Sequence, residues 1–142
     1  DESVIPRKWF HVLCQAFGET FLAEKGVSKE TLEERYVRSK GFRKDGFFLI
    51  THRSTTVATG FAFVDDSDPK IGILHWLGVV PGSRRQGIAR SIVLMILRHF
   101  FDRGIRVVRL KTEAYRKGAI AVYRKLGFSV HKNELIEISH KN

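Results

Sequence analysis

The sequence predicts a single domain, residues 1–142, in which helices flank a mixed and mostly antiparallel sheet, an α/β or α+β architecture with three layers. Two observations predict this class. Apolar runs rich in β-branched and aromatic residues, which are typical of strands, alternate along the chain with stretches that have the helical period of three to four. Their order is helix, helix, three strands, helix, strand, helix and two strands, which requires one crossover around the long helix that follows Gly87.

Two helices are predicted before the first strand. Apolar residues recur at helical spacing over residues 6–17, and Gly18 is placed to end this helix. A more polar helix is predicted over residues 28–38, with Ser28 as its N-cap. The link between them, residues 19–27, has no clear period and is predicted to be irregular.

Three strands are predicted in the middle of the chain. Residues 47–51 and 55–64 are rich in β-branched and aromatic side chains, and the short gap between them predicts a β-hairpin. The apolar run 73–80 predicts a largely buried third strand, because Pro81 and Gly82 close it abruptly.

The second half of the chain repeats the alternation of helix and strand. Residues 86–103 predict a long helix, and residues 116–126 predict a second one. The strands predicted around them are residues 107–112, 128–130 and 135–138. The apolar stripe of the long helix is expected to contain Ile88, Ile92, Met95, Ile96 and Phe100.

The turn between the third strand and the long helix predicts an anion site. The first amide groups of a helix have no partner within the helix, and they lie at the positive end of its dipole. Gly87 has no Cβ, so a bulky phosphate could approach the backbone there. Arg84, Arg85 and Arg90 would add charge and hydrogen-bond donors. A phosphate or pyrophosphate is therefore the expected ligand.

The positive charge of the chain is concentrated around the same turn. Residues 84–125 hold 12 of the 25 Lys and Arg residues but only two of the 15 acids, Asp102 and Glu113, so the rest of the chain is balanced. Such a surface suits a polyanion, and it suits equally one small ligand with several phosphate groups. Part of the excess is also explained as a solvated helix face.

Two motifs resemble those of the GNAT superfamily of N-acetyltransferases. Arg84-x-x-Gly87-x-Ala89 resembles the acetyl-CoA-binding motif Arg/Gln-x-x-Gly-x-Gly/Ala. The later stretch 119–128, which ends in Tyr-Arg-Lys-Leu-Gly-Phe, resembles the helix-to-strand segment of the same family. The resemblance is clear over residues 72–128, and the order and spacing of the two motifs agree with the family.

The resemblance implies the GNAT fold and acetyl-CoA as acyl donor. In that fold the third strand of this chain would splay from its neighbour, and the pantetheine arm would lie in the gap. The family usually has a strand before its first helix, which is expected here to be short, displaced or missing. The residues expected to contact the coenzyme are Leu77, Val79, Arg84, Arg85, Gln86, Gly87, Ile88, Ala89, Arg90, Arg116, Ala119 and Tyr123.

Two residues are candidates for the proton transfers of an acyl transfer to an amine. His75 is the candidate base, since an imidazole with a pKa of ~6.5 can accept a proton near neutrality. The period of two would place it on the same strand face as Leu77 and Val79, unless a bulge intervenes. Tyr123 occupies the position of the family's tyrosine, and it is the candidate acid for the leaving thiolate. The alternative interpretation of both residues is an ordinary place in the core.

Arg116 departs from the family pattern, which often has asparagine at this position. It could contact the coenzyme, bind an acidic group of the acceptor, or pair with Glu113. These alternatives are equally compatible with the sequence.

The expected function is transfer of an acetyl group from acetyl-CoA to a primary amine, by direct attack of the amine on the thioester. The alternatives are a coenzyme-binding regulatory domain without catalysis and a basic nucleic-acid-binding module, although no nucleic-acid-binding motif supports the latter.

No run approaches the ~18 apolar residues of a membrane span. Cys14 is the only cysteine, which fits a reducing cytoplasm and no metal site. A monomer or homodimer is expected, and the acceptor cannot be identified.

Overall fold

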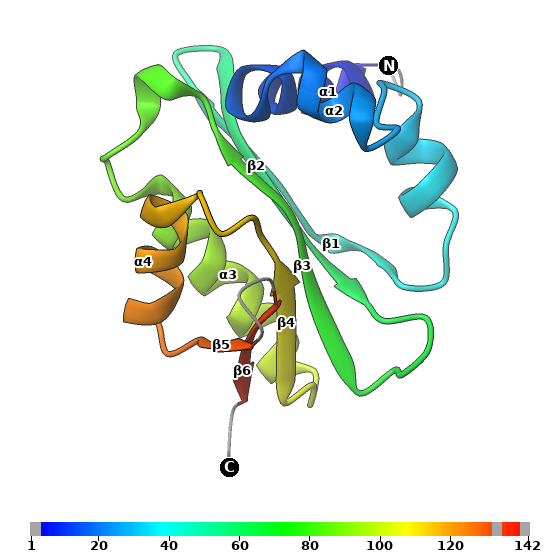
Figure 1. Ribbon diagram of the computed structural model, residues 1–142. Helices are drawn as coiled ribbons and strands as arrows, with labels where there is room; N and C mark the ends of the chain where they lie inside the picture. Colours follow the sequence, from blue (N-terminus) through cyan, green and yellow to red (C-terminus); the bar gives the residue numbers. More distant parts are fainter. Residues whose placement is uncertain (1–3, 132–134, 140–142) are drawn as a thin grey trace.

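The computed structural model describes residues 4–131 and 135–139, and their elements follow the predicted order with one additional short helix (Figure 1). In chain order the elements are α1 (Val4–Phe17), α2 (Glu19–Glu24), the π-helical turn η1 (Leu32–Val37), β1 (Phe42–His52), β2 (Thr55–Val64), β3 (Ile71–Val79), the 3-10 turn η2 (Pro81–Ser83), α3 (Ile88–Asp102), β4 (Val107–Lys111), α4 (Lys117–Lys125), β5 (Ser129–His131) and β6 (Leu135–Ser139).

The described strands form one sheet in the order β1-β2-β3-β4-β6-β5. Only the pair β3 and β4 is parallel, and every other pair of neighbours is antiparallel. The chain passes from β3 to β4 through α3, which is the single predicted crossover. Helices α1 and α2 lie on one side of the sheet, whereas α3 and α4 lie on the other (Figure 1). The predicted mixed, mostly antiparallel sheet between helical layers is confirmed.

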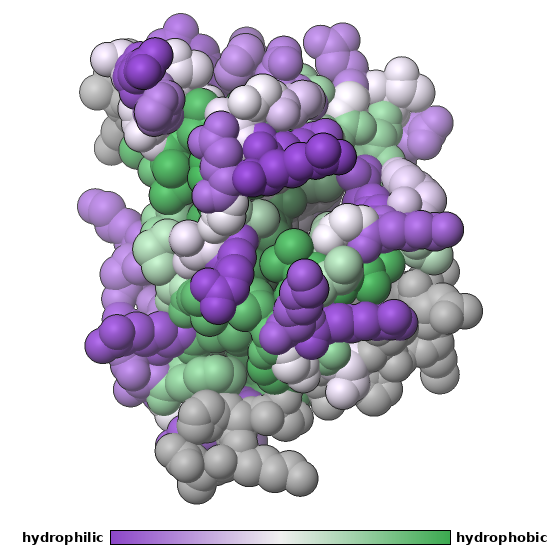
Figure 2. Space-filling model, turned by 90° about the vertical axis from the view of Figure 1, so that its left-hand side faces the viewer, coloured by the Kyte–Doolittle hydropathy of each residue, from purple (hydrophilic) through white to green (hydrophobic). Residues whose placement is uncertain are grey.

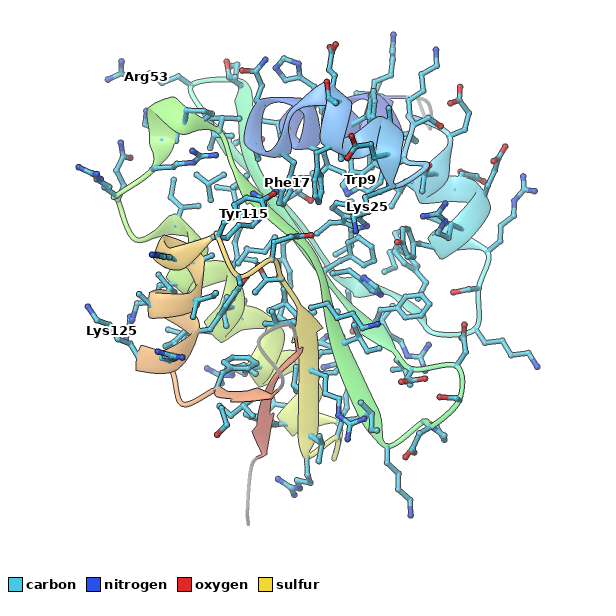
Figure 3. The ribbon with its side chains drawn as sticks, viewed as in Figure 1. Trp9, Phe17, Lys25, Arg53, Tyr115 and Lys125 are labelled. Atoms are coloured by element: carbon cyan, nitrogen blue, oxygen red, sulfur yellow. The ribbon has the colours of Figure 1, made fainter. Side chains whose placement is uncertain are left out.

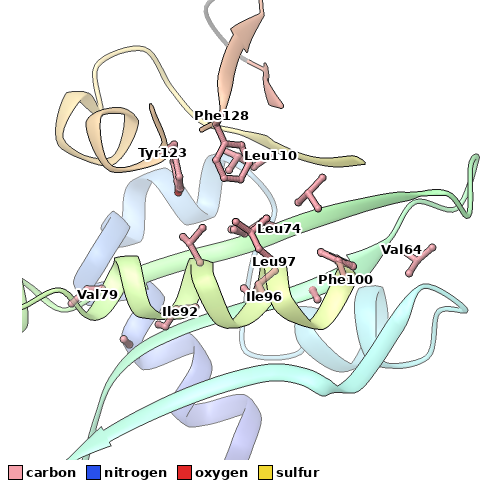
Figure 4. Close-up of a cluster of buried hydrophobic side chains, with 14 residues drawn as sticks. Val64, Leu74, Val79, Ile92, Ile96, Leu97, Phe100, Leu110, Tyr123 and Phe128 are labelled. Carbon is pink, nitrogen blue, oxygen red and sulfur yellow. The ribbon is translucent and has the colours of Figure 1, made fainter. Parts of the chain in front are cut away.

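Each side of the sheet has its own hydrophobic cluster. The cluster under α3 and α4 includes Ile92, Ile96 and Phe100 with the strand residues Leu74 and Leu110 (Figure 4). The cluster under α1 and α2 is aromatic, and its buried members are Trp9, Leu13, Leu22, Val27, Leu32, Tyr36, Phe61 and Phe63. The sheet therefore separates a mostly aliphatic core from one that is rich in aromatic residues.

The prediction of an irregular link over residues 19–27 was wrong, because α2 occupies Glu19–Glu24. Gly18 ends α1 with a left-handed φ of 89°, and the chain then turns directly into a new helix. This second helix forms because it buries Leu22 under α1, although six residues are too few to show a period in the sequence. Within the described residues, which begin at Val4, α1 is the first element.

Two helix predictions need correction at their ends. The helix predicted over residues 28–38 is assigned only at Leu32–Val37, although Ser28 accepts a cap-like hydrogen bond from the Glu30 amide at 3.3 Å. The long helix begins at Ile88 instead of residue 86, because Gly87 is left-handed and forms its N-cap.

The apolar stripe of the long helix was predicted with one wrong member. Met95 is 37% exposed, whereas Val93 and Leu97 are buried. The face of α3 that contacts the sheet is therefore centred on Ile92, Ile96 and Phe100. It is wider than the predicted stripe, because Val93 and Leu97 beside these residues are buried as well.

Among the helices of the described residues, none combines the length and the apolar character that a bilayer-spanning segment needs.

The packing of β3 against α3 predicts that Gly72→Ala is destabilising. A Cβ at Gly72 would lie 2.7 Å from the ring of Phe100, which is fully buried and cannot move away freely. We expect a loss of about 1–3 kcal/mol in the free energy of unfolding, measured by urea denaturation. Gly82→Ala is the control, since a Cβ at Gly82 meets nothing within 4 Å. Equal stability of the two variants would contradict this packing.

Candidate functional site

The site begins where β3 and β4 part. Their parallel pairing is limited to Ile71↔Val107, Gly72↔Val108 and Ile73↔Arg109, after which β3 continues to Val79 without β4 beside it. The gap forms a cleft of about 1120 Å³, lined by β3, β4, the start of α3, part of α4 and the end of α1. The splay that the family resemblance implied is therefore present.

The cleft connects the two sides of the sheet. Leu77 and Val79 belong with the core under α3, and they line the cleft together with Tyr123 of α4. Phe21, Tyr36 and Trp76, which belong to the aromatic cluster on the opposite side, line it as well. Two ligands could therefore approach the same gap from opposite faces.

The start of α3 has the open amides that the sequence predicted. Arg85 and Gly87 both have left-handed backbones, with φ of 64° and 78°, and this conformation turns the chain sharply into the helix. Within the described residues no side chain caps α3, and the first hydrogen bond that closes the helix is donated by the Ser91 amide to the Gly87 carbonyl. The preceding amides, at Ile88 and Ala89, belong to residues that line the cleft. This helix start can therefore hold an anion.

Arg84 has a role that the sequence did not predict. Its Nε donates to the carbonyl of Val79 at 3.1 Å, and a terminal nitrogen donates to the carbonyl of Ala16 at 3.1 Å. The guanidinium thus ties the end of α1 to the turn before α3. Arg85 and Arg90 are exposed at the cleft and remain the predicted phosphate contacts, whereas Gln86 does not line the cleft.

A bulge in β3 separates residues that were predicted to share a face. Phe61 pairs with His75 and Thr59 pairs with Gly78, so one strand advances by two residues while the other advances by three. Trp76 takes up the extra residue with a φ of 48°, a conformation rare for an aromatic side chain. The bulge that the prediction named as its exception is therefore present, and His75 does not share a face with Leu77 and Val79.

His75 packs in the aromatic cluster on the α1 side. Its ring centroid lies 5.1 Å from Tyr36, 5.4 Å from Phe61 and 5.2 Å from Phe63. Burial among these rings lowers the pKa of His75 to about 4, because the imidazolium would lose its hydration. His75 is therefore neutral at pH 7 and lines the cleft, but it is a much weaker base than the pKa of a free imidazole suggested.

Tyr123 lies on the opposite side of the gap. It projects from α4 into the aliphatic core, is 5% exposed, and packs edge-on against Phe128 at 5.7 Å. Burial raises its pKa above the usual value, so the phenol keeps its proton at neutral pH. A protonated hydroxyl at the cleft is compatible with the predicted role of Tyr123 as proton donor.

Arg116 bridges the two layers across the cleft. Its Nε pairs with Glu113 Oε2 at 3.1 Å, which was one of the alternatives predicted for it. Its guanidinium also lies over the rings of Phe17 and Phe21, at 4.6 and 4.9 Å from their centroids. Figure 3 shows Phe17 of α1 close to Tyr115 of the segment between β4 and α4, and Arg116 contacts both rings. The contact joins α1 and α2 to the segment that leads into α4.

Several lining residues were not identified from the sequence. From the sequence, Phe17, Tyr36 and Trp76 are expected at ordinary apolar positions of helices and strands, and Phe21 and Lys25 fall in the link predicted to be irregular. Trp76 donates from Nε1 to the Tyr36 hydroxyl at 3.0 Å, which fixes both rings at the cleft. No local pattern marks these residues, because they meet only when α1, η1 and β3 pack together.

The face that carries the turn into α3 and α4 is hydrophilic around an apolar centre. Figure 2 shows this side of the molecule, with purple side chains projecting around a green patch. The exposed basic side chains of this region include those of Arg85, Arg90 and Lys117, all of which line the cleft. An acidic ligand with an apolar arm would match this surface.

Comparison with known proteins identifies one family. A family model described as "Acetyltransferase (GNAT) family" matches residues 10–128 of this chain, which is more than half of it.

The relatives found include mycothiol acetyltransferases. That of Amycolatopsis mediterranei is 32% identical over 104 residues, which cover 69% of this chain and 35% of the relative. That of Streptomyces avermitilis is 29% identical over 129 residues, which cover 90% of this chain and 41% of the relative. The chain thus spans less than half the length of these relatives.

Solved structures share the fold at low identity. The ribosomal-protein-S18-alanine N-acetyltransferase of Escherichia coli has a TM-score of 0.69 at 18% identity, with 96% of this chain and 90% of that chain covered. A PaiA N-acetyltransferase from Thermoplasma acidophilum, solved with coenzyme A, has a TM-score of 0.70 at 18% identity, with 98% and 92% covered.

The burial of His75 predicts how stability depends on pH. Unfolded His75 binds a proton below pH ~6.5, whereas in the folded chain it does so only below about pH 4, so acid favours the unfolded state. Between pH 7.5 and 5.0 the wild type should lose about 2 kcal/mol of unfolding free energy through this residue. Over the same pH range the unfolding free energy of His75→Leu should fall by about 2 kcal/mol less than that of the wild type, as measured by urea denaturation at pH 7.5 and 5.0. Burial also lowers the pKa of His99, but His99 is present in both proteins, so its contribution to the pH dependence cancels in the comparison. Parallel pH profiles would contradict the assignment.

Proposed function

The chain belongs to the acetyltransferase (GNAT) family, and from this premise we propose that it transfers an acetyl group from acetyl-CoA to a primary amine. One observation carries the proposal. The uncapped amides that open α3 lie on the same cleft as the half-buried side chain of His75 and the buried side chain of Tyr123. A coenzyme whose diphosphate rests on those amides can extend its thioester arm into the gap between β3 and β4.

The coenzyme would be held by backbone and by apolar contacts more than by ion pairs. The diphosphate would bind the amides at Gly87, Ile88 and Ala89, with Arg85 and Arg90 beside it. The arm would run along Leu77, Val79 and Ala119. Arg84 would act indirectly, since its hydrogen bonds to Ala16 and Val79 hold the turn in place.

The reaction would proceed by direct attack on the thioester. The acceptor ammonium first loses a proton, and the amine nitrogen bonds to the carbonyl carbon. The carbon–sulfur bond then breaks, the nitrogen releases a second proton as the amide forms, and the thiolate takes up a proton, so that one proton is released overall. Tyr123 would donate a hydrogen bond to the leaving thiolate and pass it a proton, which it regains from solvent. Because burial raises the pKa of Tyr123, the phenol is a weak acid, and its contribution to the rate is modest. A backbone amide near Val79 would stabilise the oxyanion.

The first deprotonation would not depend on His75 alone. With a pKa of about 4, His75 can pass a proton to water but cannot hold it at neutral pH. Several cationic side chains also line the cleft, among them those of Arg109, Lys111 and Arg116. Their positive potential would lower the pKa of a bound ammonium, so that the amine loses its proton more readily.

The names of similar proteins indicate different acceptors. The curated relatives are named for mycothiol, and one structural neighbour is named for an alanine of ribosomal protein S18. Family membership therefore does not select the acceptor of this chain.

We also propose that residues 1–142 act as one domain in the cytoplasm, as a monomer or homodimer.

The helix start is tested by a matched pair of glycine variants. Gly87→Ala and Gly104→Ala both place a Cβ on a left-handed residue, with φ of 78° and 80°, and neither Cβ meets an atom within 4 Å. Both should cost about 1–2 kcal/mol of stability. Only Gly87→Ala should weaken acetyl-CoA binding, by about tenfold in calorimetry, because it distorts the amides that hold the diphosphate. Absence of acetyl-CoA binding by the wild type, or of thiol release with every amine offered, would refute the proposed function.

Tyr123→Phe tests the proton donor. The ring and its contact with Phe128 remain, so the acetyl-CoA affinity should change by less than about twofold. Turnover at saturating substrates should fall by about 10- to 100-fold, because the thiolate must then be protonated by water. Stopped-flow or thiol-release kinetics give turnover, and calorimetry gives affinity. Unchanged turnover would remove Tyr123 from the mechanism.

A further inference from the structure

The half of the cleft on the α1 side has a distinct lining. In β4, Val108 and Leu110 face the core under α3, so the alternation of the strand directs Lys111 to the opposite side. His75 lies on that side of β3, against Tyr36. Lys25 follows α2 and lies 5.6 Å above the ring of Phe21. We call the part of the cleft lined by Lys25, Tyr36, His75, Trp76, Lys111 and Glu113 the acceptor groove.

The acids of the cleft are already engaged. The described lining contains two carboxylates, Asp65 and Glu113. Glu113 pairs with Arg116 at 3.1 Å. Asp65 accepts hydrogen bonds from the amide and the hydroxyl of Ser67 at 2.8 and 2.7 Å, and these bonds lower its pKa. Both carboxylates thus have partners within the protein, and the Lys and Arg side chains of the same lining outnumber them.

Two lysines of the acceptor groove, in contrast, have no carboxylate partner among the described residues. Among the residues that the structure describes, neither Lys25 nor Lys111 lies within 4.0 Å of a carboxylate oxygen, and both are exposed. They come from opposite walls, Lys25 from the end of α2 and Lys111 from the end of β4. The rings of Tyr36, His75 and Trp76 lie on the lining that they share. An amine that carries a second positive charge would be repelled there, whereas one that carries a carboxylate would be attracted.

We propose that the acceptor is a primary amine that also carries a carboxylate, held by Lys25 and Lys111 in the acceptor groove. Its apolar part would lie against the ring of Tyr36. Polyamines and lysine-rich peptides are excluded as preferred acceptors by the same charge. This inference rests on the proposed function, because it assigns the second substrate of that reaction.

The test compares acceptors that differ only in charge. The dipeptides Ala-Asp and Ala-Glu are matched with Ala-Asn and Ala-Gln, amino acids are matched with their amides, and spermidine serves as the cationic acceptor. Initial rates of thiol release at low acceptor concentration give kcat/KM, and mass spectrometry confirms the acetylated product. We expect the member with the additional carboxylate to have a kcat/KM at least tenfold higher at low salt, and the ratio to shrink at high salt.

Variants then assign the preference to the two lysines. Lys25→Gln and Lys111→Gln should each reduce the charge preference at least threefold through the KM of the acceptor, with the KM of acetyl-CoA unchanged. Lys25→Glu should shift the preference toward spermidine. Lys29→Gln is the control, since Lys29 is exposed and lies outside the lining of the cleft.

The outcomes separate this inference from the function on which it rests. Acetyl-CoA binding together with equal or faster use of the neutral or cationic acceptors would overturn the inference alone. So would binding without acetylation of any acceptor that carries a carboxylate, or a charge preference that both glutamine variants retain. Absence of acetyl-CoA binding in calorimetry would overturn the proposed function and this inference with it.

Discussion

The short parallel pairing of β3 and β4 is the constraint on which the site depends. The two strands share three paired positions and then part, although each continues beyond the last pair. Full pairing would close the sheet and leave no gap between its faces. The close approach of Gly72 to Phe100 fixes β3 on α3 at the paired end, and the bulge at Trp76 redirects it at the open end. The cleft is therefore a consequence of sheet geometry, and side chains only line it.

Two arginines stabilise the layers on either side of this gap. Arg84 joins the carbonyls of Ala16 and Val79, so that α1 is connected to the turn before α3. Arg116 joins Glu113 to the rings of Phe17 and Phe21, so that the segment before α4 is connected to α1 and α2. The separated strands cannot provide these links through backbone hydrogen bonds. Long side chains with planar, multiply donating ends can cross the distance instead.

In the proposed function, positive charge would serve the binding of both substrates and the deprotonation of the amine. At the start of α3 the backbone amides and arginines suit a diphosphate. In the acceptor groove, lysines without carboxylate partners in the described chain would attract an acid and lower the pKa of an ammonium. A cleft of this kind reduces the need for a strong general base, which is consistent with the low pKa that burial gives His75. Under the proposed function, the electrostatic field of several cationic groups would do what a single imidazole of low pKa cannot.

The sequence alone determined the order of the elements, the mixed sheet and the turn that opens α3, because period, helix-breaking glycines and a basic turn are local properties. Tertiary packing decided the rest. The bulge at Trp76 places His75 on the other face of β3, and the positive φ of Trp76 is accompanied by contacts of its ring with Tyr36 and Phe17, which are distant in the sequence. The hydrogen bonds of Arg84 depend on Ala16, 68 residues away. The acceptor groove likewise combines α2, η1, β3 and β4, and no local pattern records which residues meet when four separate elements pack.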